Sequence, residues 1–165
     1  MRRRWPLVLA LLAAALDLGV KAWAAANLAP GSDRALLPGV LHLGFTTNTG
    51  VAWGLLGGQA GGLAILRLLV GSVVLAGLLL GRWPGPWRPP LALIAGGALG
   101  NALDGLTRGH VVDYLSSPAL SAATRAVGAG AFPIFNLADV WVVAGVALLL
   151  VTARTVGAQP GPSRK

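Results

Sequence analysis

Long apolar runs dominate this chain, separated by short polar or Gly- and Pro-rich stretches. A helix needs about 20 apolar residues to cross the hydrocarbon core of a bilayer. Four runs reach or approach this length, and they predict transmembrane helices over residues 5–28, 62–80, 90–106 and 134–152. The third run is short and Gly-rich, which favours a packed helix that other helices approach closely. We therefore predict an all-α membrane protein that forms a single domain over residues 1–165.

The stretches over residues 29–61 and 107–132 are predicted to be outer loops. Within the first, Val40–Asn48 alternates and is strand-prone before a Gly-rich turn, which predicts a small extracytoplasmic β-element on the membrane surface. The following segment, Asn48–Gly54, combines an amide, small residues and Trp53, and it suits a surface that grips an extended peptide or a lipid. Alternatively, Trp53 is a simple interfacial anchor.

Composition and charge agree with a membrane setting. The chain is 55% hydrophobic and 11% charged, and its net charge of +8 comes from basic residues at the ends of apolar runs, without an aromatic face for bases. Nucleic acid is therefore not an expected partner. The positive-inside rule predicts that both termini are cytoplasmic. The residues assigned to the cytoplasmic side are Arg2, Arg3, Arg4, Arg82, Arg88, Arg154, Arg164 and Lys165, against Arg34, Arg108 and Arg125 outside.

Carboxylates are the rarest and most informative polar groups in the chain. There are five, all Asp, and Asp104, Asp113 and Asp139 lie inside or against apolar stretches. An ionised Asp at the centre of a bilayer costs roughly 2.5 to 3.5 kcal/mol, so its presence there indicates a function. Two carboxylates that share one proton can act as base and acid in amide hydrolysis, because repulsion raises one pKa. We predict that Asp113 and Asp139 are such a catalytic pair, without assigning the proton to either.

Other polar residues are candidates for supporting roles. Asn101 and Asn136 could orient the carboxylates or stabilise an oxyanion. Asp104 follows Asn101 by three positions and shares its helix face, which favours a structural role, although a pairing of Asp104 with Asp139 is also open. Asp17 and Lys21, four positions apart, can neutralise each other in a first helix that is retained and not cleaved as a signal peptide; the pair is either structural or functional.

Metal and thiol chemistry are not expected. The chain has no cysteine, and only His42 and His110 offer imidazole. A lone interfacial histidine is more often a hydrogen-bonded bystander than a base. We therefore expect neither a metal site nor a cofactor.

Five motifs occur in an order that resembles bacterial lipoprotein signal peptidase, or signal peptidase II. They are Asp17 with Lys21, Asn48–Gly54, Gly97–Asp104, Gly109–Asp113 and Phe132–Asp139. The resemblance covers roughly residues 17–145, and the last three motifs together are highly specific.

The resemblance implies a membrane aspartic endopeptidase that cleaves the signal peptide of a diacylglyceryl-modified prolipoprotein immediately before the lipidated cysteine. It also implies a bacterial cytoplasmic membrane location, an active site at the extracytoplasmic face, contact with phospholipid, inhibition by globomycin, and a monomer. The residues that match are Asp113 and Asp139 as catalytic dyad, with Asn48, Asn101, Asp104, Asn136, Asp17 and Lys21 as site support or substrate-binding residues.

The chain departs from the family pattern in three places. The family normally has an Arg directly after the Asp of the Asn-x-x-Asp motif, where this chain has Gly105; Arg108 is the candidate replacement. The segment Ser116–Gly130 is longer than expected and is read as a mobile flap or a tolerated surface insertion. Trp53 stands where Phe is usual.

Two further function classes are open. Intramembrane Asp residues also mark proton pathways, which would fit a small proton- or ion-coupled transporter, although no inverted repeat is visible. The missing Arg would fit a catalytically impaired homologue that assists assembly.

Overall fold

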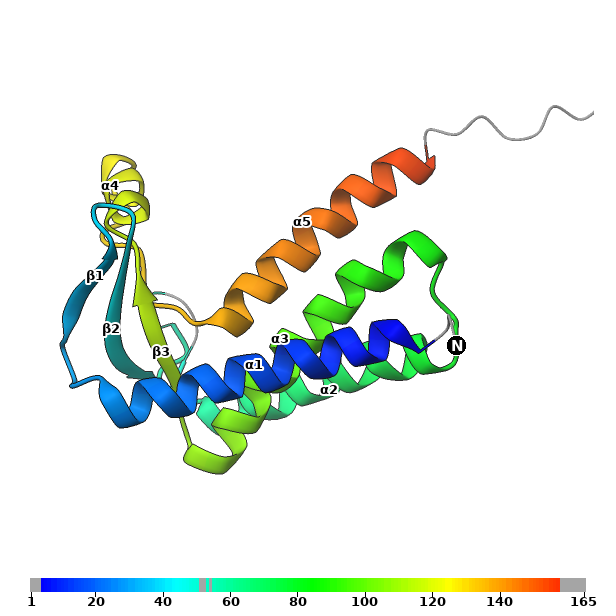
Figure 1. Ribbon diagram of the computed structural model, residues 1–165, viewed down its shortest axis with the longest axis horizontal. Coiled ribbons are helices and arrows are strands. Elements are labelled where there is room, and N and C mark those ends of the chain that lie inside the picture. Colours follow the sequence, from blue (N-terminus) through cyan, green and yellow to red (C-terminus); the bar gives the residue numbers. More distant parts are fainter. Residues whose placement is uncertain (1–3, 51–52, 54, 158–165) are drawn as a thin grey trace, which may run out of the picture.

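The structure, a computed structural model, describes residues 4–50, 53 and 55–157 (Figure 1). Its elements follow in the order α1 (Trp5–Asn27), β1 (Asp33–Leu37), β2 (Leu41–Asn48), α2 (Ala60–Leu79), the short 3₁₀ helix η2 (Gly85–Trp87), α3 (Arg88–Arg108), β3 (Val111–Ser116), α4 (Pro118–Ala126) and α5 (Leu137–Gly157). Helices therefore form where the four apolar runs predict them. Arg2, Arg3, Arg164 and Lys165 lie outside the described residues.

Three helices of the described chain are long and apolar enough to cross a membrane: α1, α2 and α5. The fourth predicted span corresponds to α3, which has 21 residues but is less apolar, because its C-terminal half carries Asn101 and Asp104. The prediction of a mainly helical protein with a small β-element is confirmed, and three of its four spans meet the length and hydropathy expected of a membrane helix.

Helix α3 is the centre of the helical layer, since α1, α2 and α5 all pack against it. The Gly-rich part of α3 makes this possible. A Cβ at Gly96 would meet the Ala10 carbonyl oxygen at 2.6 Å, and a Cβ at Gly97 would collide with the Ala138 carbonyl oxygen. Two helices thus approach α3 through adjacent glycines, as the sequence predicted.

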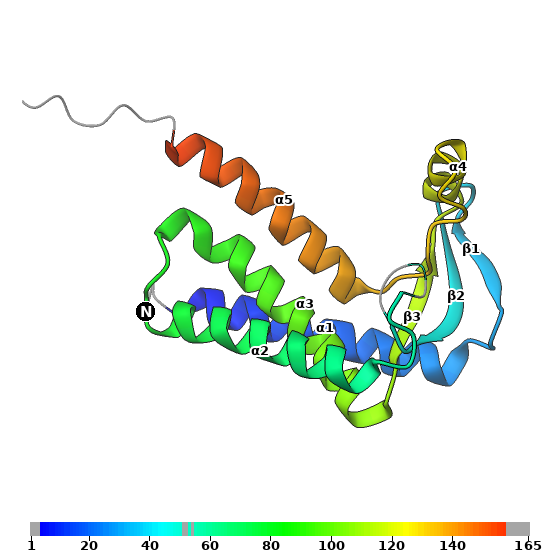
Figure 2. The ribbon, with the colours of Figure 1, turned by 180° about the vertical axis from the view of Figure 1, so that it is seen from behind.

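A three-stranded antiparallel sheet lies at one end of the helices, in the order β1-β2-β3 (Figures 1 and 2). The predicted strand over Val40–Asn48 is confirmed as β2. The predicted outer loop over residues 107–132 contains β3 and α4, two elements that the sequence analysis did not predict. The N-terminal end of α1 and the C-terminal end of α5 both lie at the end remote from the sheet (Figure 2).

The last long helix begins three residues later than predicted, at Leu137. Residues before it run beside β3: the Phe135 N–H donates to the Leu115 carbonyl oxygen at 2.8 Å, and the Leu115 N–H donates back to the Phe135 carbonyl oxygen at 2.8 Å. This bridge fixes where α5 starts relative to the sheet, so that the first turn of α5 lies against β3.

Candidate active site

Asp113 and Asp139, the two predicted catalytic residues, line the same cavity of about 340 Å³. Asp113 is the third residue of β3, where it is 2% exposed, and Asp139 lies in the first turn of α5. The two residues come from different elements and meet because the Phe135 bridge places the start of α5 beside β3.

Asn136 connects both carboxylates. Its side-chain N–H donates to Asp113 Oδ1 at 2.6 Å, and its backbone N–H donates to Asp139 Oδ2 at 3.2 Å. The Asp139 N–H donates in return to Asn136 Oδ1 at 3.1 Å. This reciprocal pattern is a capping box, in which the residue before the helix and the third helical residue satisfy each other's backbone N–H groups. Asn136 thus caps the start of α5 and also bonds to Asp113 and Asp139.

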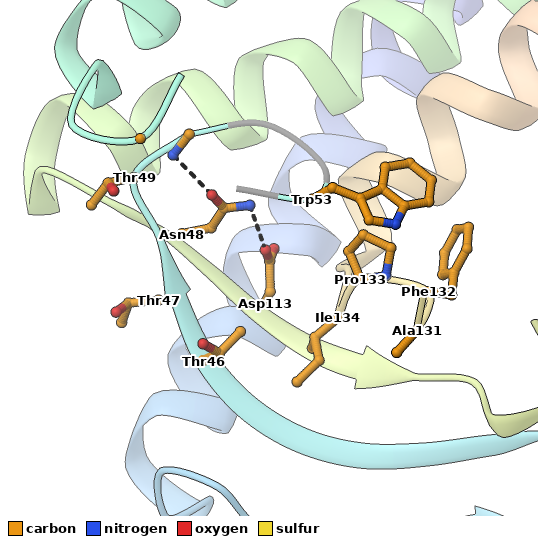
Figure 3. A pocket seen from close by; sticks show the side chains of 12 residues that line it. Thr46, Thr47, Asn48, Thr49, Trp53, Asp113, Ala131, Phe132, Pro133 and Ile134 are labelled. Atoms are coloured by element: carbon orange, nitrogen blue, oxygen red, sulfur yellow. Dashed lines mark hydrogen bonds between the residues drawn. The ribbon is translucent and has the colours of Figure 1, made fainter. Parts of the chain in front are cut away.

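Two more amides complete the shell around the dyad. Asn101 Nδ2 donates to Asp139 Oδ1 at 2.9 Å, and Asn48 Nδ2 donates to Asp113 Oδ2 at 3.1 Å. Asn48 pairs with Val111 across the sheet, so its side chain lies diagonally beside that of Asp113. Figure 3 shows Asn48 beside Asp113. The Gly50 N–H donates to Asn48 Oδ1 at 2.8 Å.

The other three predicted residues form a buried charge cluster behind the dyad, which we call the Lys21 cluster: Lys21, Asp17 and Asp104. Lys21 Nζ lies 2.8 Å from Asp17 Oδ2 and 3.8 Å from Asp104 Oδ2, and all three side chains are at most 1% exposed. Lys21 Nζ also donates to Asn101 Oδ1 at 2.6 Å. In the described part of the chain, the partners of Asp104 are Lys21, Arg108 and the Val112 N–H, and Asp139 is not among them.

The Lys21 cluster binds the backbone next to both Asp113 and Asp139. Asp17 Oδ1 accepts from the Ala138 N–H at 2.8 Å, and Asp104 Oδ2 accepts from the Val112 N–H at 2.7 Å. Ala138 precedes Asp139 and Val112 precedes Asp113. All eight predicted residues therefore belong to one connected network.

The environment of Asp113 favours its protonated form. Burial first, and then the negative charge of Asp139, raise the pKa of Asp113 to about 7, against the opposing effect of the amide donors. Burial likewise raises the pKa of Tyr114 above its usual range, so this phenol keeps its proton.

Sequence reasoning missed Tyr114 and Arg67. Tyr114 is 2% exposed, and its hydroxyl accepts from the Leu137 N–H at 3.2 Å, which adds a further support for the start of α5. The sequence could have indicated a role for Tyr114, because it directly follows Asp113. Arg67 lines the dyad cavity from α2.

Neither histidine is among the described residues that line the dyad cavity. His42 Nδ1 of β2 lies 2.7 Å from Asp33 Oδ1 of β1. In the described part of the chain, no three His, Cys, Asp or Glu side chains group together as metal ligands would.

A wider cavity of about 520 Å³ adjoins the dyad on the sheet side. Thr46 and Thr47 of β2 lie on one side of it, and Trp53, Phe132 and Pro133 lie on the other (Figure 3). Trp53 Nε1 donates to the Ala129 carbonyl oxygen at 3.1 Å, and its ring packs edge-on against Phe132. The dyad thus opens toward a trough with one hydroxyl-bearing side and one aromatic side.

Comparison with known proteins agrees with this geometry. A family model described as Signal peptidase (SPase) II matches residues 9–155. The chain belongs to the signal peptidase II family. It is 45% identical over 157 residues to a lipoprotein signal peptidase of Deinococcus radiodurans, covering 90% of this chain and 78% of that protein, and 37% identical over 162 residues to one of Gloeobacter violaceus, covering 97% and 88%.

Two solved structures share the fold of this signal peptidase II homologue. Both are described as bacterial membrane enzymes. One has a TM-score of 0.80 at 23% identity and covers 97% of this chain and 94% of its own; the other has a TM-score of 0.73 at 24% identity and covers 90% and 91%. Family membership and the apolar helices together make this chain an integral membrane protein and a peptidase family member.

Arg108, the candidate replacement for the family Arg, lies beside Asp104. Arg108, one turn after Asp104, places Nε 2.7 Å from Asp104 Oδ1. A Cβ on Gly105 would lie 2.9 Å from Ala64 Cβ of α2, so this position is a close helix contact. Asp104 therefore has two cationic neighbours, Lys21 and Arg108, although position 105 has no side chain.

The long segment after Asp113, predicted to be a mobile flap or a tolerated surface insertion, contains helix α4 and bonds to the sheet. Ser117 caps α4 by accepting from the Leu120 N–H at 3.2 Å, and its hydroxyl donates to the Val40 carbonyl oxygen at 2.7 Å. Thr124 donates to the Gly130 carbonyl oxygen at 2.8 Å. The segment is thus fastened to the sheet and ends beside Trp53.

Proposed function

We propose that this protein is an aspartic endopeptidase that cleaves the signal peptide from diacylglyceryl-modified prolipoproteins immediately before the lipidated cysteine. The observation that carries the proposal is the joint placement of Asp113 and Asp139 in one cavity, each bonded to Asn136. The comparisons supply the substrate class, because the relatives are named lipoprotein signal peptidases.

In the proposed mechanism, one carboxylate takes a proton from water while the other, protonated, acts as the acid. The raised pKa of Asp113 supports Asp113 as the proton carrier near neutrality and Asp139 as the base. The water oxygen attacks the scissile carbonyl carbon, the C–N bond breaks, and the leaving amine receives a proton. Asn48, Asn101 and Asn136 hold the carboxylates so that little reorganisation is needed during the reaction.

We further propose that α3 is a fourth span and that the whole chain is one monomeric domain in the bacterial cytoplasmic membrane. The described ends of α1 and α5 lie at the same end of the molecule, which supports two cytoplasmic termini with the sheet and dyad outside (Figure 2). Phospholipid would surround the apolar helices, and globomycin would occupy the groove at the dyad. A proton-coupled transporter has less support, because the buried carboxylates gather near the sheet end instead of lining a path across the helices.

The test is cleavage of a purified diacylglyceryl-prolipoprotein in detergent or bilayers. We expect Asp113→Asn and Asp139→Asn to lose activity by about 10³-fold or more while remaining folded, because each removes an acid or base. Asp33→Asn is the matched control, since Asp33 is an exposed carboxylate of β1. Globomycin should block the wild type.

Two results would contradict the proposal. Cleavage that survives in either dyad variant would exclude the aspartic mechanism. A folded wild type that does not cleave would instead support the catalytically impaired homologue.

A further inference from the structure

Arg67 is the one charged residue of α2, and the proposed mechanism leaves it without a role. Charged side chains within membrane helices are costly, and by default they mark a functional site. None of the ion pairs between described residues includes Arg67; its guanidinium donates to the Gly50 carbonyl oxygen at 3.3 Å. An intramembrane cation without a carboxylate partner in the described chain requires an explanation.

Arg67 lies at the level of the dyad. Helices α2 and α3 pack with Ala64 beside Gly105 and with Gly71 beside Leu99, so Arg67 falls opposite the turn that contains Asn101. Arg67 and Asn101 both line the dyad cavity. Arg67 of α2 and Asp139 of α5 therefore line the same cavity.

A second, apolar cavity begins at the same place. This α2–α5 groove, of about 330 Å³, starts at Arg67, Asn101 and Asp139 and is otherwise lined by Leu66, Val70, Ile94, Ala98, Val142 and Val143. Its extent along α3, from Asn101 back to Ile94, is about 10 Å at 1.5 Å per residue, or about two helical turns. On all three helices the lining residues lie away from the sheet, so the groove runs from the dyad into the membrane.

The groove is open on one side. Helices α2 and α5 both pack on α3 and diverge from each other (Figure 2). The rim residues Leu66, Val70 and Val143 are 56%, 44% and 68% exposed. This face suits an apolar helix that lies in the membrane with its end at the dyad.

We propose that the α2–α5 groove binds the apolar helix of the signal peptide, and that Arg67 caps the C-terminal carbonyls of this helix. The inference rests on the proposed function. A signal peptide enters from the cytoplasmic side, so its C-terminal end reaches the dyad. The last four carbonyl groups of a helix lack partners within it and carry partial negative charge. A guanidinium at that end donates hydrogen bonds to these carbonyl groups and offsets their partial negative charge. The residues after the helix then remain extended, as cleavage requires.

The kinetic test compares two substrates with wild type, Arg67→Gln and Arg67→Lys. One is the full prolipoprotein, and the other is a lipidated peptide that lacks the apolar segment. For the full substrate we expect Arg67→Gln to raise KM about ten- to hundredfold with little change in kcat, and Arg67→Lys to recover part of the loss. For the short peptide, kcat/KM should change by less than about threefold. Arg34→Gln, on the exposed outer strand, is the control.

Equal losses on both substrates would overturn the proposal, because they would assign Arg67 to bracing the Gly50 loop or to the chemical step. A fall in kcat alone would do the same.

A crosslink tests the groove without turnover. The chain has no cysteine, so single cysteines can be introduced cleanly. In an Asp113→Asn background, Val70→Cys should form a disulfide with a cysteine placed in the substrate's apolar segment, whereas Val73→Cys, which is 65% exposed and does not line the groove, should not. Equal crosslinking at both positions, or none at Val70, would refute the groove assignment. Wild-type failure to cleave, with crosslinking at Val70 intact, would refute the peptidase activity and leave binding in place.

Discussion

The Lys21 cluster and the proposed catalytic dyad are neighbouring groups of carboxylates in different electrostatic settings. Asp17 and Asp104 lie beside Lys21, and Asp104 also beside Arg108, whereas Asp113 and Asp139 receive their hydrogen bonds from amides and backbone N–H groups. The clustered carboxylates bond to backbone N–H groups of β3 and α5, and the dyad carboxylates line a cavity.

The difference shows how one residue type serves two purposes. A carboxylate beside a buried cation has a partner for its charge, and both such carboxylates here accept a hydrogen bond from a backbone N–H group. A carboxylate held by neutral amides beside another carboxylate can exchange a proton, because neither charge is cancelled. Asn101 joins the two settings, since its oxygen accepts from Lys21 and its nitrogen donates to Asp139.

The largest effect is expected from removing the cation of the Lys21 cluster. Lys21→Met leaves Asp17 without its ion-pair partner in a fully buried site. Breaking a buried pair from one side costs about 3 to 5 kcal/mol of the free energy of unfolding, and we expect that loss here. The measurement is the unfolding midpoint in detergent.

The double variant Asp17→Asn, Lys21→Met is the control. It removes both members of the pair, so it should recover part of the stability that the single variant loses. A single variant as stable as wild type would show that the pair does not hold the fold.

A smaller effect is expected from removing one of the amides that donate to the dyad. Asn48→Ala removes a donor that lowers the pKa of Asp113, so this pKa should rise further. A dyad that needs one proton then keeps it to higher pH, and we expect the alkaline limb of kcat/KM to move up by about one unit. Thr47→Ala, which lines the adjoining trough, is the control for substrate contact. A shift to lower pH would contradict the assignment.

The smallest effect is expected at the edge of the Lys21 cluster. Arg108 is 39% exposed, and an ion pair of this kind contributes about 1 kcal/mol or less. Arg108→Gln should therefore lower stability by at most that amount and leave cleavage within about twofold, because Lys21 still faces Asp104. Arg125→Gln in α4 serves as comparison. A loss as large as that of Lys21→Met would make Arg108 the essential cation.

Helices and candidate residues were predictable to different degrees for physical reasons. Apolar length predicted four helices, because a span must satisfy its own backbone hydrogen bonds locally. Strand β3 was missed, because Val111–Ser116 pairs with β2, a segment far away in the sequence. Helix α4 was missed as well, since its anchors at Val40 and Gly130 lie outside it.

The eight site residues were predicted mainly through resemblance to the family, and their roles remain proposals. The spacing of Asn136 and Asp139 held an additional signal, the capping box, which would have placed the start of α5 at Leu137. The sequence shows that Arg67 is a charge within an apolar helix. Its position at the end of the α2–α5 groove could not be predicted, because it depends on how α2 packs on α3.

By itself, the sequence determined the membrane setting, the helices and the scarcity of carboxylates, because these depend on composition and on local periodicity. Only the tertiary structure decided which carboxylates meet cations and which meet amides. That choice depends on contacts between segments far apart in the chain, such as Lys21 with Asn101 and Asn48 with Asp113. Burial makes these contacts decisive, since a charge out of water takes its protonation state from the few groups that touch it.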